Sequence, residues 1–225
     1  MDPSTSISRR ALLQLGVGAA AGVTAGKLLG QSVDGRSCEA TPQQTSGPFY
    51  PTTRQADEDV DLTLIEGHND RAEGTIVRVG GQIVDQECRP VEGALVEIWQ
   101  ANTRGRYHHE RDAENPRPVD PNFQGWAKML TGEDGQYEFK TIQPGSYPVD
   151  DSGWIRPPHI HFRVARRGHH ELITQMYFAG QELNESDRIL QALSSAEQEE
   201  VIVAFDADRE DATPVGRFDI VLPLV

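Results

Sequence analysis

Apolar and polar residues alternate in short runs along residues 75–225 of this 225-residue chain. Alternation with a period of two is the pattern of a β-strand that buries one face. Residues 132–135, with the sequence GEDG, are typical of a hairpin turn between two such runs. The pattern predicts at least seven strands, over residues 75–84, 93–100, 126–131, 136–142, 159–166, 172–178 and 217–224. We therefore expect an all-β fold, an antiparallel β-sandwich whose long loops can carry a site.

One short helical region is predicted near the C-terminus, between Asn184 and Ala204. Asn184 or Ser186 can act as its N-cap, and Ser195 with Gln198 has the spacing of a capping box. The sequence contains neither an internal repeat nor a glycine-rich phosphate-binding loop. The sandwich is therefore the expected core of the chain.

Residues 1–30 differ in composition from the rest. Arg9 and Arg10 stand ahead of a Gly/Ala-rich apolar stretch that only Lys27 interrupts. Such a segment is typical of a twin-arginine export signal, and a single membrane anchor is the alternative. We expect a periplasmic or secreted protein in which residues 31–74 form an N-terminal arm and residues 75–225 the folded domain.

The chain is acidic, with a formal net charge of −14 at pH 7. The predicted export signal holds more basic than acidic residues, so the remainder is more acidic still. Nucleic acids and anionic membrane surfaces are poor partners for such a body. An anionic small molecule would need a local basic pocket.

The two cysteines, Cys38 and Cys88, fit an oxidising compartment and can form a disulfide. Two buried free thiols would look the same in the sequence, so both alternatives stay open. A metal site built from cysteines needs more thiols than these and is excluded.

The most specific chemical signal is the pair His159 and His161. On a strand both imidazoles project from the same face, and two neutral imidazoles side by side can bind a transition metal. A solvated sheet face is the alternative. No acidic residue lies between Phe162 and Arg167 or next to His159, which argues against a cupin and against a two-histidine, one-carboxylate ferrous site. A zinc site needs a third histidine, and the candidates occur as adjacent pairs in predicted turns: His108, His109, His169 and His170.

Tyrosine is another source of ligands. Tyr107 follows the strand predicted at 93–100, and Tyr147 lies in a Pro-Gly-Ser-Tyr-Pro turn ahead of the histidine strand. A phenol has a reference pKa near 10, so binding as phenolate needs a strong Lewis acid such as ferric iron. For each tyrosine, a place in the core or at its rim is the alternative.

Five runs of sequence carry a resemblance to a known family. They are VEIWQANTRGRYHH, DPNFQGWAKMLTGEDGQYEFKTIQPGSYP, WIRPPHIHFRV, LITQMYFAG and RFDIVL, in this order within residues 75–225. The chain resembles the intradiol ring-cleavage dioxygenases, most closely the iron-binding β chain of protocatechuate 3,4-dioxygenase. The resemblance implies that non-haem Fe(III) is held by Tyr107, Tyr147, His159 and His161. It implies a catechol and O2 as reactants, and cleavage between the two hydroxyl-bearing carbons to a cis,cis-muconate.

The resemblance also implies roles for residues around the metal. Tyr147 would be the ligand that the substrate displaces, Arg156 would stabilise charge on the ring, and Gln175 would hydrogen-bond near it. Trp99 would line the pocket, although a buried structural tryptophan is equally compatible. Val149 stands where a close relative has an aromatic residue, which predicts a looser pocket wall.

A loop that the related two-chain enzyme takes from its α chain has a counterpart here in Gly47, Pro48 and Tyr50. The chain would supply this loop to its own site or to a neighbouring copy, so we expect a homo-oligomer, or a hetero-oligomer with an α-type chain. The substrate stays open among catechols, and Arg54, Arg104 and Arg106 are candidates to bind a carboxylate.

Two other functions remain as alternatives. One is an exported transthyretin-like β-sandwich that binds aromatics or polysaccharide without catalysis, and the other is a zinc hydrolase. A binding module has no reason to keep two tyrosines, two histidines and Arg156 together. A hydrolase lacks the third histidine and a placed general base.

Overall fold

The computed structural model describes residues 37–225, except for 54–56, 58, 151 and 207–212. The predicted export signal and Arg54 lie outside the described residues. Among those described, no helix is long and apolar enough to cross a membrane.

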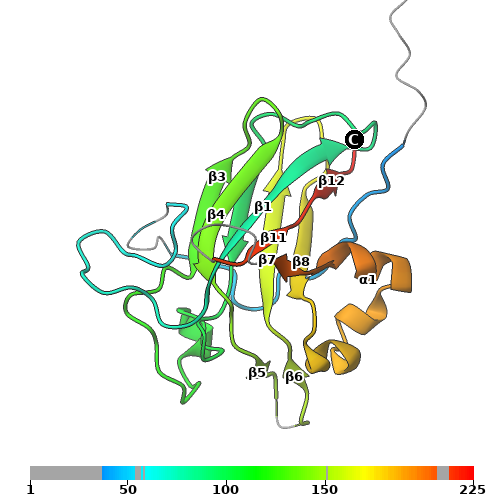
Figure 1. The fold of residues 1–225 in the computed structure, drawn as a ribbon. Coiled ribbons are helices and arrows are strands. Elements are labelled where there is room, and N and C mark those ends of the chain that lie inside the picture. The colour runs from blue at the N-terminus through cyan, green and yellow to red at the C-terminus, as the bar shows by residue number, and fades with distance from the viewer. Residues whose placement is uncertain (1–36, 54–56, 58, 151, 207–212) are drawn as a thin grey trace, which may run out of the picture. The chain divides into compact units, whose positions relative to one another are not determined.

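Two five-stranded sheets form the body of the domain (Figure 1). One sheet has the order β10-β11-β1-β12, with β4 also paired to β1, and the other has the order β3-β2-β7-β8-β9. A two-stranded ribbon, β5-β6, extends beyond one end of the sheets (Figure 1). The strand bounds are β1 Ile76–Asp85, β2 Leu95–Trp99, β3 Trp126–Leu130, β4 Gln136–Ile142, β5 Tyr147–Pro148, β6 Ile155–Arg156, β7 His159–Ala165, β8 Leu172–Phe178, β9 Ile202–Val203, β10 Phe205–Asp206, β11 Val215–Arg217 and β12 Ile220–Leu222.

The core lies between the two sheets. Phe139 of β4 and Phe162 of β7 meet with ring centroids 6.0 Å apart, and Phe218 packs on Phe162 at 5.0 Å. Burial alternates along the whole of β1, as the period-two pattern predicts for a strand with one face on the core. The predicted β-sandwich is confirmed.

The pairing within the sheets is mixed rather than purely antiparallel, which corrects one part of the prediction. Strand β1 pairs in parallel with both β11 and β12, and β8 pairs in parallel with β9. The strand predicted at 217–224 is divided around Phe218 into β11 and β12. Alternation shows which face of a strand is buried, but it carries no information about the direction of the neighbouring strand.

The predicted helical region is three short pieces rather than one helix. Two 3-10 turns, η2 (Glu182–Ser186) and η3 (Leu190–Ala192), precede a single α-helix, α1 (Ser195–Val201). The N-cap of α1 is Ser194, and its capping-box partner is Glu197. Asn184 is no helix cap, because it lies buried within η2 and donates to the Phe178 carbonyl oxygen at 2.9 Å.

Residues 37–53 form a strap across the sheets. Its backbone amides bond to both of them, Thr41 to the Val221 carbonyl at 3.2 Å and Gln44 to that of Ile173 at 2.7 Å. Further along the N-terminal arm, Leu62 is fully buried in the core. The arm therefore packs onto the sandwich.

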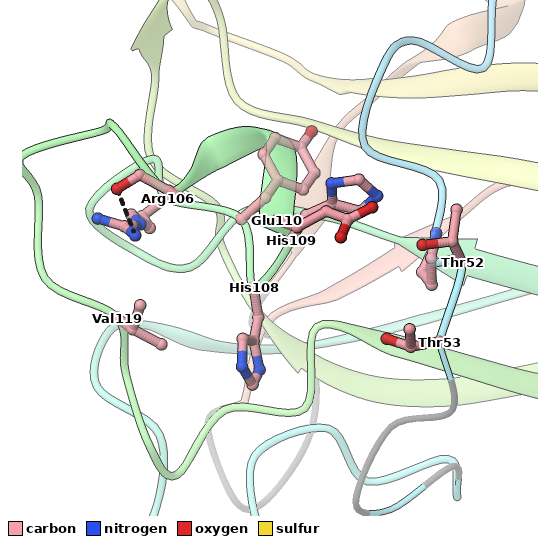
Figure 2. A pocket seen from close by; sticks show the side chains of 10 residues that line it. Thr52, Thr53, Arg106, His108, His109, Glu110 and Val119 are labelled. Atoms are coloured by element: carbon pink, nitrogen blue, oxygen red, sulfur yellow. Dashed lines mark hydrogen bonds between the residues drawn. The ribbon is translucent and has the colours of Figure 1, made fainter.

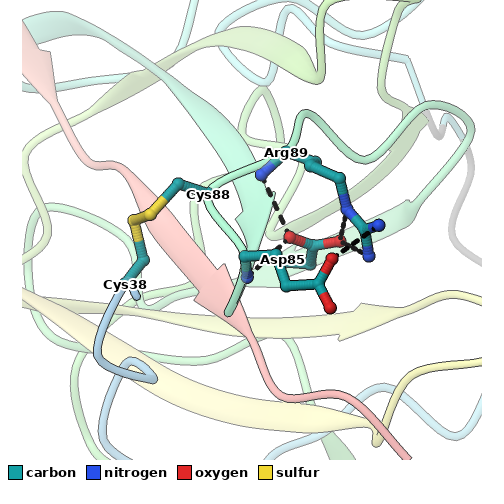
Figure 3. Close-up of a disulfide and its surroundings, with 5 residues drawn as sticks. Cys38, Asp85, Cys88 and Arg89 are labelled. Atoms are coloured by element: carbon teal, nitrogen blue, oxygen red, sulfur yellow. Dashed lines mark hydrogen bonds and ion pairs between the residues drawn. A yellow bond between two sulfur atoms is a disulfide. The ribbon is translucent and has the colours of Figure 1, made fainter. Parts of the chain in front are cut away.

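A disulfide fastens the start of the strap. Cys38 is bonded to Cys88, with their Cα atoms 5.4 Å apart (Figure 3). Cys88 has a φ of 59°, which is uncommon for a residue with a side chain. Asp85 supports this turn, because its Oδ1 accepts the backbone N–H of Glu87 and of Arg89 at 2.9 and 3.0 Å. Of the two alternatives for the cysteines, the structure has the disulfide.

Replacing both cysteines by serine should lower the free energy of unfolding by about 4 kcal/mol, because the disulfide restricts a loop of some fifty residues in the unfolded chain. Urea unfolding of the oxidised parent and the double variant measures the difference. Adding reductant should destabilise the parent toward the variant and leave the variant unchanged. Equal stability of the oxidised parent and the variant would contradict the prediction.

Candidate functional site

The two predicted metal-binding histidines lie on the face of β7 that points away from the core. Ile160, between them, is fully buried in the core cluster. Strand register places Gln175 and Trp99 opposite His161 from either side, and directly paired residues point to the same face of a sheet. Loops and the strap cover this outer face, so the imidazoles are only 2% and 1% exposed. The alternative of a solvated sheet face is thus excluded.

Four potential ligand side chains converge here. The Nε2 atoms of His159 and His161 are 3.2 Å apart, and the Tyr107 phenol oxygen is 3.4 Å from Nε2 of His159. The phenols of Tyr107 and Tyr147 are hydrogen-bonded to each other. The structure therefore brings together all four residues that the sequence nominates: Tyr107, Tyr147, His159 and His161.

The orientation of His159 is set by the backbone. Its Nδ1 lies 2.7 Å from the carbonyl oxygen of Pro157, to which the ring N–H donates. This bond leaves the lone pair on Nε2, which faces His161 and Tyr107. Such a bond to the outer nitrogen is the usual support of a histidine that binds a metal.

Aromatic rings hold the cluster in place. Trp99 stacks on His161 with centroids 4.8 Å apart and planes 3° from parallel, and Tyr50 packs edge-on against Trp99. Phe49 stacks on Tyr107 at 4.5 Å. The strap thus contributes directly to the packing of two candidate ligands.

Burial governs the electrostatics of the cluster. It lowers the pKa of both imidazoles well below the usual value, with a further contribution from Arg156. It also raises the pKa of the Tyr107 and Tyr147 phenols, assisted at Tyr107 by the neighbouring Tyr147 and opposed at Tyr147 by Arg156. The protein alone therefore holds neutral imidazoles and neutral phenols, and only a strong Lewis acid would ionise the phenols.

These residues fit a ferric ion better than zinc. Among the described residues, no group of three or more His, Cys, Asp or Glu could hold a metal, so a metal in this cluster would depend on the phenol oxygens. Neutral phenols become phenolate ligands only when a strongly Lewis-acidic ion, such as a trivalent one, ionises them. The zinc hydrolase alternative lacks its third histidine in the structure as it does in the sequence.

Arg156 lies beside the cluster on β6. Its pairing with Tyr147 in the β5-β6 ribbon turns the two side chains to the same side. Its Nη2 donates to Oε1 of Gln175 at 2.8 Å and to the Tyr177 phenol at 3.1 Å. Asp187 accepts hydrogen bonds from Nε and Nη2 and completes a buried ion pair, with an Nη2 to Oδ2 distance of 3.0 Å.

A cavity of about 510 Å³ opens onto Tyr147 and Arg156. The predicted pocket residues Gly47, Pro48 and Val149 line it. Gly47 has a φ of +63°, and a Cβ there would only make an ordinary contact with His161, so the turn rather than space requires glycine. The wall is mixed, with Phe49, Trp154 and Ile189 as apolar members and Arg111, Asp112 and Glu114 as charged ones.

Three other predicted residues do not line this cavity. Trp99 and Tyr50 lie behind the His161 ring, and the Tyr50 hydroxyl donates to Oε1 of Glu97 at 3.1 Å. Gln175 is fully buried beneath Arg156. Their contacts are with the residues that form the site.

A second cavity, of about 400 Å³, is lined by Tyr107, His108 and His109, and the two histidine side chains point apart (Figure 2). His109 is a local structural residue, because its Nδ1 accepts the Arg111 backbone N–H at 3.0 Å and its Nε2 lies 3.1 Å from the Tyr50 carbonyl oxygen. Neither histidine joins the four-residue cluster.

Two of the candidate carboxylate-binding arginines, Arg104 and Arg106, lie away from the cavity of about 510 Å³. Arg104 forms an ion pair with Glu73, and Arg106 donates to the carbonyl oxygens of Asn115 and Arg117. Besides Arg156, the arginine that reaches the wall of that cavity is Arg111.

Sequence reasoning missed Arg111, Phe49 and Asp187. Phe49 could have been found from its place within the Gly-Pro motif. Asp187 gave no signal, because it lies in a segment that the sequence predicted to be helical.

Comparison with known proteins agrees with this geometry. Residues 45–223 match a family model described as Dioxygenase. The protocatechuate 3,4-dioxygenase beta chain of Burkholderia cepacia is 39% identical over 182 residues, which are 78% of this chain and 76% of that protein. The catechol 1,2-dioxygenase of Candida albicans is 32% identical over 154 residues, covering 63% of this chain and 48% of the longer enzyme.

Solved structures show the same fold. The dioxygenase domain of a dioxygenase carbohydrate-binding protein fusion from Streptomyces sp. SirexAA-E aligns with a TM-score of 0.62 and 26% identity over 83% of this chain and 100% of that one. The catechol 1,2-dioxygenase from Acinetobacter sp. ADP1 aligns with a TM-score of 0.63 and 28% identity, covering 83% and 63% of the two chains.

The lowered pKa of the two imidazoles predicts how the metal-free protein responds to acid. Unfolded histidines take up protons near pH 6.5, whereas His159 and His161 stay neutral in the folded protein, so stability is full above this pH and falls as the pH drops below it. Each such proton adds a slope of up to about 1.4 kcal/mol per pH unit. Urea unfolding of chelator-treated protein between pH 7.5 and pH 5 measures the slope.

Changing both histidines to asparagine should reduce that slope. His108→Gln is the matched control, because it removes an imidazole outside the buried cluster and should leave the slope in place. A slope that survives in the His159→Asn/His161→Asn variant would contradict the assignment to these two residues.

Proposed function

The chain belongs to the intradiol ring-cleavage dioxygenase family, and we propose that Tyr107, Tyr147, His159 and His161 bind a non-haem ferric ion. The observation that carries the proposal is the convergence of two imidazole nitrogens and two phenols in a buried cluster next to an open cavity. The substrate is a catechol, which reacts with O2 and opens between its hydroxyl-bearing carbons to a cis,cis-muconate. Both oxygen atoms enter the product.

A bound ferric ion supplies Lewis acidity, which ionises phenols and orients a chelating catechol toward O2. The chain supplies the rest. The Pro157 carbonyl holds His159 with its lone pair on Nε2. Tyr147 lines this cavity and Tyr107 does not, so Tyr147 would be the tyrosine that gives way to the substrate. The oxygen of Tyr147 would then accept the proton of one catechol hydroxyl group, and the proton of the other would pass to water in the open cavity.

Arg156 supplies the positive charge on the cavity side. Negative charge that develops on an ionised catechol ring is stabilised most where a fixed cation faces it in a site that excludes water. Arg156 is 3% exposed and hydrogen-bonds with Tyr147, so it stands where that charge would form. Gln175 helps to orient Arg156 by accepting a hydrogen bond from its Nη2.

The substrate is proposed to be protocatechuate-like, a catechol that carries a carboxylate. Two considerations support this: a protocatechuate 3,4-dioxygenase beta chain is 39% identical over 78% of this chain, and Arg111 stands at the cavity wall. Val149, 43% exposed, leaves that wall open to a ring substituent.

Export through the twin-arginine pathway remains part of the proposal. The disulfide supports it, because disulfides persist in the periplasm and outside cells. A homo-oligomer, or assembly with an α-type chain, is also proposed from the kind of relative that the chain matches. Recovery of all active protein from the cytoplasm would contradict the first proposal, and a fully active monomer would contradict the second.

The ferric site predicts a coloured protein. Tyrosinate-to-iron charge transfer should give the purified protein visible absorption, and a catechol should shift the band and start oxygen consumption. Removing the iron should abolish both. A colourless protein that retains a full complement of iron would contradict the assignment.

Two variants separate the roles within the cluster. His161→Ala should lose the metal, because it removes a buried nitrogen ligand with no substitute nearby. Tyr147→Phe should keep part of the iron but alter turnover, since the displaceable oxygen is gone. Equal iron retention in the two variants, measured by metal analysis, would contradict these roles.

Arg111→Gln tests the proposed substrate. It should raise KM for 3,4-dihydroxybenzoate, roughly ten-fold if one exposed charge-assisted contact of about 1.5 kcal/mol is lost, and leave KM for unsubstituted catechol unchanged. Arg104→Gln, on an arginine paired with Glu73 away from the cavity, is the matched control. An equal rise for both substrates would argue against carboxylate recognition by Arg111.

A further inference from the structure

Asp187 is a carboxylate with no exposed surface. Its Oδ1 accepts the Trp154 indole N–H at 3.2 Å and the Arg156 Nε–H at 3.1 Å, while Oδ2 accepts from Nη2 of Arg156 at 3.0 Å. It follows η2, and the η2–η3 segment that carries it also brings Ile189 to the cavity wall. A segment remote in sequence from the metal cluster is thus joined to Arg156 by a buried charge.

The hydrogen bonds of Arg156 leave one edge of its guanidinium group for the cavity. Asp187 takes Nε and part of Nη2, and Nη2 also donates to Gln175 and Tyr177. These bonds fix the plane of the group and direct Nη1 away from Asp187. Nη1 is therefore the nitrogen that is left for Tyr147 and for a ligand in the cavity.

Stability alone does not explain a buried ion pair. Two charges lose their hydration on burial, and apolar residues of similar size commonly stabilise a fold as well or better. The pair does, however, have fixed geometry, because a planar guanidinium that binds a carboxylate through two nitrogens cannot rotate freely. Because Arg156 lines the adjacent cavity, a fixed guanidinium can face a ligand bound there.

We propose that Asp187 is a positioning residue that holds Arg156 with Nη1 directed at the catechol ring. Gln175 and Tyr177 complete the frame, and Gln175 also ties it to the strap by donating to the Thr45 carbonyl at 3.2 Å. The proposal rests on the proposed function for its effect on turnover. The immobilisation of Arg156 is a property of the folded chain and is measurable without substrate.

The first measurement is therefore independent of activity. Nitrogen-15 labelling of arginine allows the exchange of each Nε–H with water to be followed by NMR, with Arg156→Gln identifying the signal. The Arg156 Nε–H should exchange slowly in the parent and much faster in Asp187→Asn. Asp219→Asn, which breaks an exposed 2.8 Å pair with Arg217, is the matched control and should leave the signal unchanged.

The second measurement is a double-mutant cycle on turnover. Asp187→Asn keeps the shape of the side chain but removes its charge, and should lower kcat about 10- to 100-fold while iron content, visible absorption and KM change little. In an Arg156→Gln background the same change should have no further effect, because Asp187 acts only through Arg156.

The outcomes separate this proposal from the proposed function. Unchanged Nε–H exchange in Asp187→Asn would overturn the positioning role. So would a kcat in the double variant that falls by the product of the two single-variant factors, for Asp187→Asn and Arg156→Gln. An iron-loaded parent that opens no catechol ring would overturn the proposed function instead. If Asp187→Asn does not fold, Tyr177→Phe, which removes only one acceptor from Nη2, should give a smaller fall in kcat that also vanishes in the Arg156→Gln background. A fall that persists there would overturn the proposal.

Discussion

Burial of strand β7 on both faces is the constraint on which the rest of the structure depends. One face carries Ile160 and Phe162 into the core between the sheets, and the other carries His159 and His161 into the ligand cluster. Antiparallel sheets commonly leave one face to water. Here loops and the strap must cover the outer face. Only where water is excluded can the imidazoles stay neutral at a pH below their ordinary pKa.

The strap shows how one chain completes this cover. Its Phe49 ring stacks on Tyr107, its Gly47 turn lies against His161, and its backbone receives a hydrogen bond from Gln175. A short extended segment has few contacts of its own to hold it, so its ends decide its position. The disulfide fixes one end, the amide of Gln44 bonds to β8 in the middle, and the Tyr50 hydroxyl donates to Glu97 near the other end. The Gly-Pro wall of the cavity is therefore supplied within the chain, and an assembly would not be required to provide it.

Period-two alternation predicted the strands well, because burial of one face leaves a direct mark on composition. It could not predict that β11 and β12 run parallel to β1, since strand direction follows from crossovers that span many residues. The side of β7 that holds the histidines was also predictable from their spacing. Asp187 was not, because an aspartate beyond a short turn looks solvated until the fold places it under Arg156. Likewise, the sequence could not show which arginine would bind a carboxylate, because only the fold shows which one lies at the cavity wall.

The site is assembled so that its charges are balanced before any ligand arrives. The chain as a whole is strongly acidic, yet the cluster holds neutral imidazoles and phenols, and its one buried cation is paired with Asp187. A trivalent ion would therefore enter a region with no net charge of its own, and its binding is favoured only because the two phenols can ionise. With two phenolates such an ion would keep a charge of +1, and a doubly ionised catechol in place of one phenolate would bring the sum to zero. The fixed pair of Arg156 and Asp187 then contributes direction rather than net charge, which is the property that a developing charge on one part of a ring requires.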